Sequence, residues 1–222
     1  MERMLSWPEV GAKGGDNTHR NQPDLAFIFD ELTKVKPFNP REKKMTEAMD
    51  LNKILVGILT GSPNDLPKVV KVRDTLTELG IRSEIVVASA HRTPDKVFAY
   101  LDRAHAEGVQ VLIGCAGVAA HLAGVIAGHT RLPVIGLPLG NGPLSGWDSL
   151  LSTVQMPPGV PVATVAIDGS RNAAILAARI LALKYPVIDE ELQKLAERDR
   201  ERYDQTADEA LASLQVKGAD KS

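Results

Sequence analysis

Five short apolar runs alternate with helical patterns between residues 53 and 183, and this alternation limits the possible folds more than any other feature. Each run suits a buried strand, and apolar residues at helical spacing follow it. Strands and helices that alternate in this way form a parallel sheet with helices on its faces. The sequence therefore predicts an α/β fold. Its predicted strands are residues 54–59, 85–88, 109–113, 132–138 and 160–167.

Two glycines and a proline mark where the predicted helices begin and end. Gly80 and Gly108 each follow a helical pattern, at the position where a left-handed residue usually ends a helix. Thr93 and Pro94 suit a helix start, with the threonine hydroxyl as N-cap and the proline at the first helical position. Further helices are expected to begin within the run of small residues from Cys115 to Gly124, at Trp147 and at Asn172.

The chain divides into three parts. Residues 1–52 contain scattered glycine, asparagine and proline and are expected to be an extension that is partly disordered or packed on a neighbour. Residues 53–184 carry the α/β pattern and form the predicted catalytic domain. Residues 185–222 form a charged helical tail with a thin apolar stripe, which we expect to pack on a neighbouring subunit. A solvated helix is the alternative for this tail.

Composition excludes several classes of partner and location. Lys and Arg total 26 against 28 Asp and Glu, so broad electrostatic binding to nucleic acid or anionic lipid is not expected. The sequence has no apolar run of membrane-spanning length and no signal-peptide pattern at its start. Its single cysteine, Cys115, indicates a reducing compartment, and the cytoplasm is the expected location. Cys115 itself is interpreted as a small buried residue, with a catalytic thiol as the alternative.

The loop after the second predicted strand carries the strongest chemical signal. The apolar run stops at Ser89, and His91 and Arg92 follow before the next helix. Ligands of parallel sheets bind at the carboxyl ends of the strands. An arginine there can bind a phosphate through paired hydrogen bonds, and a histidine can move a proton near neutral pH.

Two other strand-end loops contribute candidates. Ser62 and Asp65 follow the first strand, where helix N–H groups can bind phosphate and a carboxylate can accept ribose hydroxyls. An ordinary helix cap is the alternative for Asp65. His121 follows the third strand within a run of small residues. His91 and His121 have no accompanying cluster of carboxylates or thiolates, so no metal site is predicted. His105 and His129 are interpreted as ordinary helix-face residues.

Several of these segments, taken together and in order, resemble the PurE family of purine biosynthesis. The similarity is closest to its class I members, the N5-carboxyaminoimidazole ribonucleotide mutases, and extends over residues 54–183. The matching segments are Gly61-Ser62-x-x-Asp65, Ser89-Ala90-His91-Arg92-Thr93-Pro94, Ala119-Ala120-His121-Leu122, Asp148-Ser149-Leu150-Leu151-Ser152, Val154-Gln155-Met156-Pro157 and residues 159–167.

This resemblance implies a flavodoxin-like three-layer subunit that assembles as a homo-octamer and works without a metal or organic cofactor. The implied reaction releases the carboxylate from the exocyclic nitrogen of the substrate as CO2, which the ring carbon then captures in a closed pocket. His91 would act as both acid and base. Ser62 and Asp65 would bind the ribose and phosphate end, and Arg92 the phosphate with Ser89 in support. Ala119 and His121 would line the pocket.

Several residues depart from the family pattern. Asn64 replaces a serine, Leu66 a tryptophan, Val118 a glycine and Ala123 a proline, and Asn141-Gly142-Pro143 stands where the family usually has Ser-Lys. A lysine missing from the pocket could change CO2 handling or substrate choice. A direct aminoimidazole ribonucleotide carboxylase, a related enzyme for another ribonucleotide and a non-catalytic nucleotide-binding scaffold therefore remain alternatives. The resemblance also suggests a functional link to the synthetase that makes the substrate.

Overall fold

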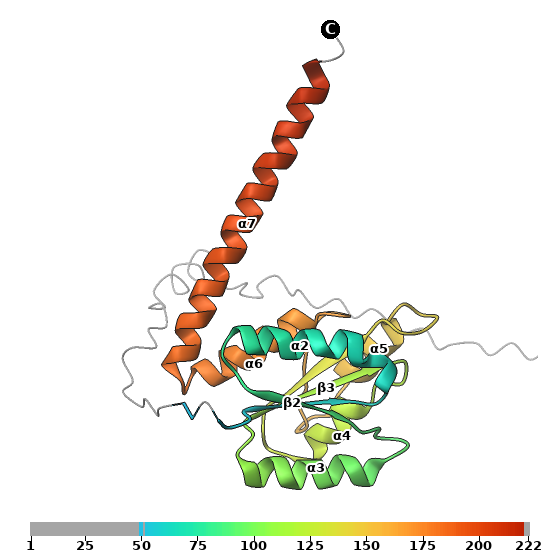
Figure 1. Ribbon diagram of the computed structural model, residues 1–222. Coiled ribbons are helices and arrows are strands. Elements are labelled where there is room, and N and C mark those ends of the chain that lie inside the picture. The colour runs from blue at the N-terminus through green and yellow to red at the C-terminus, as the bar shows by residue number, and fades with distance from the viewer. Residues whose placement is uncertain (1–48, 51, 220–222) are drawn as a thin grey trace, which may run out of the picture. The chain divides into compact units, whose positions relative to one another are not determined.

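The protein folds around one parallel five-stranded sheet (Figure 1). The computed structural model describes residues 49, 50 and 52–219, so the predicted extension 1–52 lies almost entirely outside the described residues. The strand order is β2-β1-β3-β4-β5, the flavodoxin-like order, which confirms the predicted α/β class. The strands are β1 (Val56–Thr60), β2 (Ser83–Val87), β3 (Val111–Gly117), β4 (Val134–Leu139) and β5 (Ala163–Thr164).

Helices cover both faces of the sheet. In Figure 1, α2 and α6 lie on one face, and α3 and α4 lie on the other. Gly80 and Gly108, with φ angles of 71° and 85°, follow α2 and α3 in the left-handed conformation, as predicted. The helices are α2 (Leu66–Glu78), α3 (Pro94–Glu107), α4 (Leu122–His129), α5 (Trp147–Val154), α6 (Ser170–Ala182) and α7 (Pro186–Ala219), and a short 3-10 helix, η2 (Pro63–Asp65), precedes α2.

Each face of the sheet has its own hydrophobic core. One core joins β1, β3 and β4 to α2 and α6, and the other joins the sheet to α3 and α4. Gly114 in β3 allows α4 to approach closely, because a Cβ on Gly114 would lie 2.8 Å from the Cα of Ala123. This contact fixes the start of α4 against the carboxyl end of β3, where the candidate site lies.

The fifth strand is shorter than the sequence predicts. β5 pairs with β4 only at Ala163 and Thr164, whereas the apolar run predicts residues 160–167. Asp168 still donates its N–H to the carbonyl of Pro138, but Pro138 has no N–H with which to return a hydrogen bond. A proline in the neighbouring strand thus limits the ladder at this edge.

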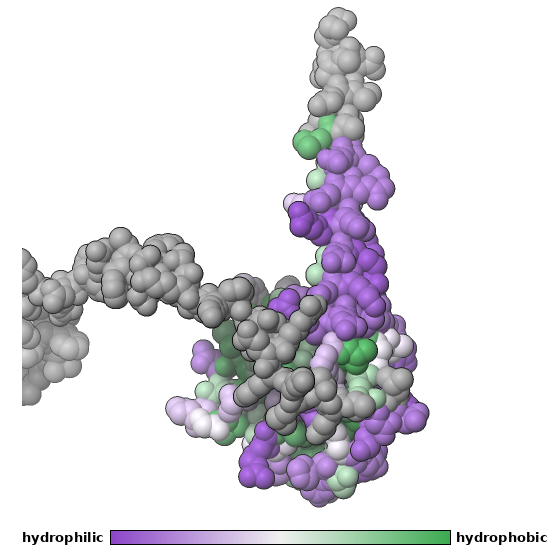
Figure 2. All heavy atoms as spheres, turned by 90° about the vertical axis from the view of Figure 1, so that its left-hand side faces the viewer, coloured by the Kyte–Doolittle hydropathy of each residue, from purple (hydrophilic) through white to green (hydrophobic). Residues whose placement is uncertain are grey.

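Among the described residues, helix α7 packs on the rest of the subunit over its first turns. Ile188 and Leu195 are 1% and 3% exposed in the core beside α6, whereas Tyr203 and Leu211 are 74% and 60% exposed. Figure 2 shows hydrophilic side chains over most of the visible surface of this helix. Packing of its outer part on a neighbouring subunit stays a prediction. None of the described helices combines the length and apolar character needed to cross a membrane.

Candidate active site

The loops that follow β1, β2 and β3 line a hollow of about 460 Å³ at the carboxyl edge of the sheet. After β1 the chain crosses to one face of the sheet, and after β3 it crosses to the other, so a crevice opens between these neighbouring strands. The pocket is lined by Gly61, Ser62, Asp65, Ser89, Ala90, His91, Arg92, Ala116, Gly117, Val118, Ala119 and Leu122. Every site residue predicted from the sequence except His121 is among them.

His121 reaches the pocket through His91. Nε2 of His91 lies 2.9 Å from Nδ1 of His121, and the two rings are nearly perpendicular. One of these nitrogens donates a proton to the other, so each histidine fixes the tautomer of its partner. This pairing was not predicted, because the sequence places the two residues on separate loops and gives no signal of their contact.

Ser89 and Arg92 organise the loop after β2. The Ser89 hydroxyl accepts the backbone N–H groups of His91 and Arg92, at 3.4 and 3.2 Å. Nη2 of Arg92 donates to the carbonyl of Gly61 at 2.8 Å, which ties this loop to the loop after β1. The guanidinium keeps further N–H groups with which to bind an anion at the pocket.

The predicted role of Thr93 as a side-chain helix cap is wrong. Pro94 does begin α3, but the Thr93 hydroxyl makes no capping hydrogen bond to that helix. Instead, Oγ1 of Thr93 accepts the N–H of Ser89 at 2.9 Å. The hydroxyl therefore closes the turn that holds His91 and Arg92, and the helix start depends on the proline.

Asp65 is a buried carboxylate at the pocket, 6% exposed. Its side chain makes no capping hydrogen bond to α2, so the structure does not support the alternative of a simple helix cap. Oδ2 receives the Thr60 hydroxyl at 3.3 Å, and Oδ1 receives the side-chain amide of Asn141. Ser62 has a local role as well, because its hydroxyl accepts the Asn64 N–H at the start of η2.

Helix α5 supports the loop of small residues. The N–H of Ala120 donates to Oγ of Ser152 at 3.0 Å, and this hydroxyl in turn donates to the backbone of α5. Ala119, which precedes Ala120 in the chain, is exposed at the pocket. Ser152 was not among the predicted site residues, although it lies in the segment Asp148-Ser149-Leu150-Leu151-Ser152 that carries part of the family resemblance, which is a usable signal.

Cys115 is fully buried in β3 and is a free thiol. Burial, aided by the negative charge of Asp65, raises the pKa of this thiol far above its usual range. A thiolate nucleophile is thus disfavoured, and the structure supports the interpretation of Cys115 as a packing residue. Among the described residues, no group of three or more His, Cys, Asp or Glu side chains is arranged to hold a metal ion.

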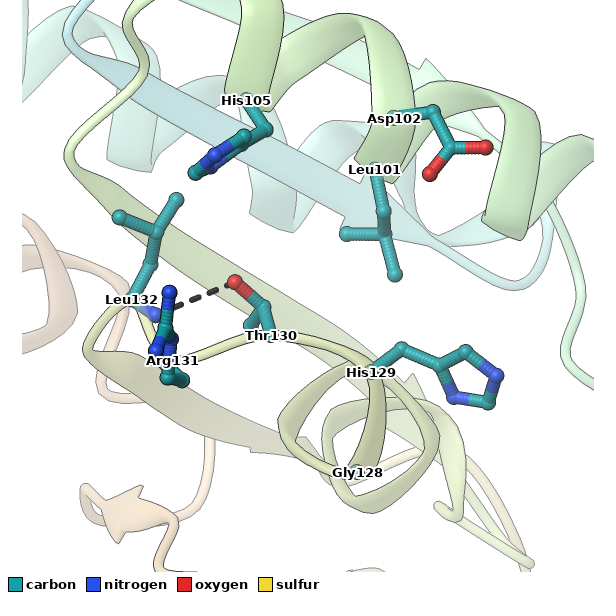
Figure 3. Close-up of a pocket in the computed structure, with 8 residues that line it drawn as sticks. All are labelled: Leu101, Asp102, His105, Gly128, His129, Thr130, Arg131 and Leu132. Carbon is teal, nitrogen blue, oxygen red and sulfur yellow. Dashed lines mark hydrogen bonds between the residues drawn. The ribbon is translucent and has the colours of Figure 1, made fainter.

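A larger hollow of about 830 Å³ lies elsewhere, between the second half of α3 and the end of α4 (Figure 3). His105 and His129 line it as helix residues, as the sequence predicts. The His129 ring stacks on Phe98, with 4.2 Å between the ring centroids. None of the loops that follow the strands lines this hollow, so we assign the chemistry to the smaller pocket.

Val118 is strained where it lines the pocket. Its φ angle is 56°, a conformation that a β-branched residue rarely adopts, and its side chain is 51% exposed. We expect Val118→Gly to raise the free energy of unfolding by about 1 kcal/mol, measured by urea denaturation. As a control, Val187→Gly in the first turn of α7 should lower it by about 0.5 kcal/mol. A loss of stability for Val118→Gly would contradict the interpretation of strain.

Comparison with known proteins identifies the family. The chain matches the model described as AIR carboxylase over residues 55–202. N5-carboxyaminoimidazole ribonucleotide mutase of Pyrococcus horikoshii is 52% identical over 150 residues, which are 68% of this chain and 85% of that protein. The protein of the same name from Pseudomonas aeruginosa is 51% identical over 142 residues, 63% of this chain and 87% of its own.

Solved structures agree. The crystal structure of Treponema denticola PurE matches with a TM-score of 0.61 and 27% identity, covering 69% of this chain and 96% of that one. The resemblance seen in the strand-end motifs is thereby confirmed, and the fold is the one these motifs imply. The chain belongs to the AIR carboxylase family, also called the PurE family.

Proposed function

We propose that this protein is an N5-carboxyaminoimidazole ribonucleotide mutase of purine biosynthesis, which produces 4-carboxy-5-aminoimidazole ribonucleotide. The observation that carries the proposal is one pocket holding a paired histidine, His91, beside an arginine, Arg92, and a buried carboxylate, Asp65. The names of the relatives support the same reaction. Binding alone would not require a proton-transferring pair at this position.

The proposed chemistry has two steps. First, the bond between the exocyclic nitrogen and its carboxylate breaks, and CO2 leaves while the electron pair stays on nitrogen, which takes a proton from His91. The ring carbon C4 then attacks the CO2, and the proton that C4 loses returns to His91. The short contact between His91 and His121 gives the proton a second position between these steps. No metal or organic cofactor takes part in this scheme.

The other pocket residues would orient the ligand. Arg92 would bind the phosphate, with Ser89 shaping its loop, and Asp65 would accept ribose hydroxyls beside Ser62. Ala119 and the neighbouring small residues would surround the CO2. Such a gas molecule must be kept from escaping, so the reaction favours a pocket closed to bulk water.

A second subunit would help to close the pocket. In the single chain His91 and Ala119 are exposed, and an exposed apolar row follows α5 and the turn before it. This row consists of Leu144, Trp147, Leu151 and Val154. An apolar row of this kind typically marks a subunit contact, which supports a homo-oligomer. The resemblance implies that this oligomer is an octamer. A cytoplasmic location and a functional link to the synthetase that makes the substrate belong to the same proposal.

One assay separates the candidate functions. The purified protein is incubated with N5-carboxyaminoimidazole ribonucleotide and, separately, with aminoimidazole ribonucleotide, each with and without bicarbonate. The mutase should convert the first substrate at a rate that is independent of added bicarbonate. Consumption of aminoimidazole ribonucleotide alone, in proportion to CO2, would instead show a direct carboxylase. Binding without turnover of either compound would show a scaffold and overturn the proposal.

A further inference from the structure

A chain of polar contacts reaches Asp65 from outside the pocket. Asn141, in the loop after β4, donates its side-chain amide to Oδ1 of Asp65, although the two residues are 76 positions apart. Oδ1 of the same asparagine accepts a hydrogen bond from Nζ of Lys68 on α2 at 2.9 Å. We propose that Lys68 and Asn141 are positioning residues that fix the Asp65 carboxylate for binding the ribose of the ligand. This inference rests on the proposed function, which gives Asp65 its role.

The two ends of the Asn141 amide are bound to groups of opposite charge. An ammonium group can only donate, and a carboxylate can only accept. The Lys68 ammonium therefore requires the amide oxygen to face it, and this orientation turns the amide nitrogen toward Asp65. The Lys68 cation polarises the Asn141 amide and so strengthens its hydrogen bond to the Asp65 carboxylate, which is thereby held in place. Because Lys68 is not hydrogen-bonded to Asp65, the carboxylate keeps lone pairs for ligand hydroxyls.

Asp168 holds the Lys68 ammonium group next to the side-chain amide of Asn141. Nζ of Lys68 lies 2.7 Å from Oδ1 of Asp168, and the same oxygen accepts the N–H of Gly140 at 3.0 Å. Although partial burial opposes it, these two hydrogen bonds lower the pKa of Asp168 below its usual value. The two side chains are 30% and 43% exposed, so the ion pair itself adds little to folding stability. Its effect is to position the Lys68 ammonium group beside the amide oxygen of Asn141.

The loop that carries Asn141 also contacts the pocket wall. A Cβ added at Gly117, which lines the pocket, would lie 3.2 Å from the Cβ of Asn141. Asn141 therefore sits between Gly117 on one side and Asp65 on the other. A change at this position should act first on the ligand-binding carboxylate, and only weakly on the two hydrophobic cores, which contain neither Asn141 nor Lys68.

The test uses the full-length chain with four single variants. Asn141→Leu and Lys68→Met remove the contacts, Lys68→Arg keeps the cation, and Asn141→Asp adds a carboxylate next to Asp65. We measure kcat and KM for N5-carboxyaminoimidazole ribonucleotide, the Kd of ribose 5-phosphate by calorimetry, and unfolding in urea. Asn141→Leu should weaken ribose 5-phosphate binding about tenfold, equivalent to about 1.4 kcal/mol. Lys68→Met should weaken this binding less than Asn141→Leu does. Lys68→Arg, which keeps the cation, should retain most of the affinity of the unmodified protein.

Two further readouts separate positioning from a structural role. In Asn141→Asp the two adjacent carboxylates would share one proton, so binding relative to the unmodified protein should recover as the pH falls from 8 to 5. In an Asp65→Ala background, Asn141→Leu should cause no further loss, because its effect passes through Asp65. Additive losses in this double variant, or a Kd that stays within twofold in Asn141→Leu, would overturn the inference.

The outcomes also distinguish this inference from the proposed function. If the unmodified protein turns over the ribonucleotide and the variants bind as it does, the positioning role fails and the function stands. If the unmodified protein binds neither ribose 5-phosphate nor the ribonucleotide, the proposed function fails, and the role of Lys68 and Asn141 fails with it.

Discussion

His91→Asn should lower kcat by about 10²- to 10⁴-fold, the usual contribution of general acid–base catalysis. Asparagine is close in size to the imidazole and can still hydrogen-bond to His121, but it cannot take up and return a proton near neutral pH. The turn that holds position 91 depends on Ser89 and Thr93 and should persist. KM for the ribonucleotide should therefore change only a few-fold. Steady-state kinetics with N5-carboxyaminoimidazole ribonucleotide measure both quantities.

His105→Asn is a matched control for this variant. His105 lies on α3 at the other hollow, away from the strand-end loops, so its replacement should leave kcat unchanged. The kcat of His121→Asn should lie between those of His91→Asn and His105→Asn, because this variant removes the partner of the His91 ring and leaves the ring itself. If His91→Asn kept more than a tenth of the wild-type kcat, the proton would have to move through another group.

Local patterns predicted most of the fold. The ends of α2 and α3 follow from Gly80 and Gly108, because only a residue that tolerates positive φ ends a helix in this way. The pocket itself follows from topology, since parallel strands bring their carboxyl ends to one edge of the sheet. The sequence alone therefore places Ser62, His91 and Ala119 together.

The side-chain contacts of Asp65 could not be predicted from local patterns or topology. Asn141 is in a loop without periodicity, where Gly142 and Ser145 have positive φ angles, and nothing in its sequence indicates that it reaches back to Asp65. Relative to the family pattern, this loop lacks a lysine. The structure instead shows that Lys68, from α2, is hydrogen-bonded to that loop. A long-range side-chain contact of this kind depends on how the start of α2 and the loop after β4 lie in the folded chain.

Arg92→Met should raise KM for the ribonucleotide about 100-fold and change kcat much less. Charge-assisted hydrogen bonds to a guanidinium contribute about 1.5–3 kcal/mol each, and loss of a paired set at the phosphate gives an effect of this size. The contact of Arg92 with the Gly61 carbonyl already fixes the guanidinium across the pocket mouth. Most of the loss should therefore appear as weaker binding of the phosphate group.

Arg92→Lys tests whether geometry or charge matters at this position. Lysine keeps the positive charge but cannot both hold the Gly61 carbonyl and present two parallel N–H groups to a phosphate. We expect it to recover only part of the affinity, with a KM between those of the unmodified protein and Arg92→Met. Competition by ribose 5-phosphate should weaken in the same order, whereas competition by ribose should not change. If Arg92→Met bound ribose 5-phosphate as tightly as the unmodified protein, the phosphate would lie elsewhere in the pocket, and the orientation proposed for the ligand would have to be reversed.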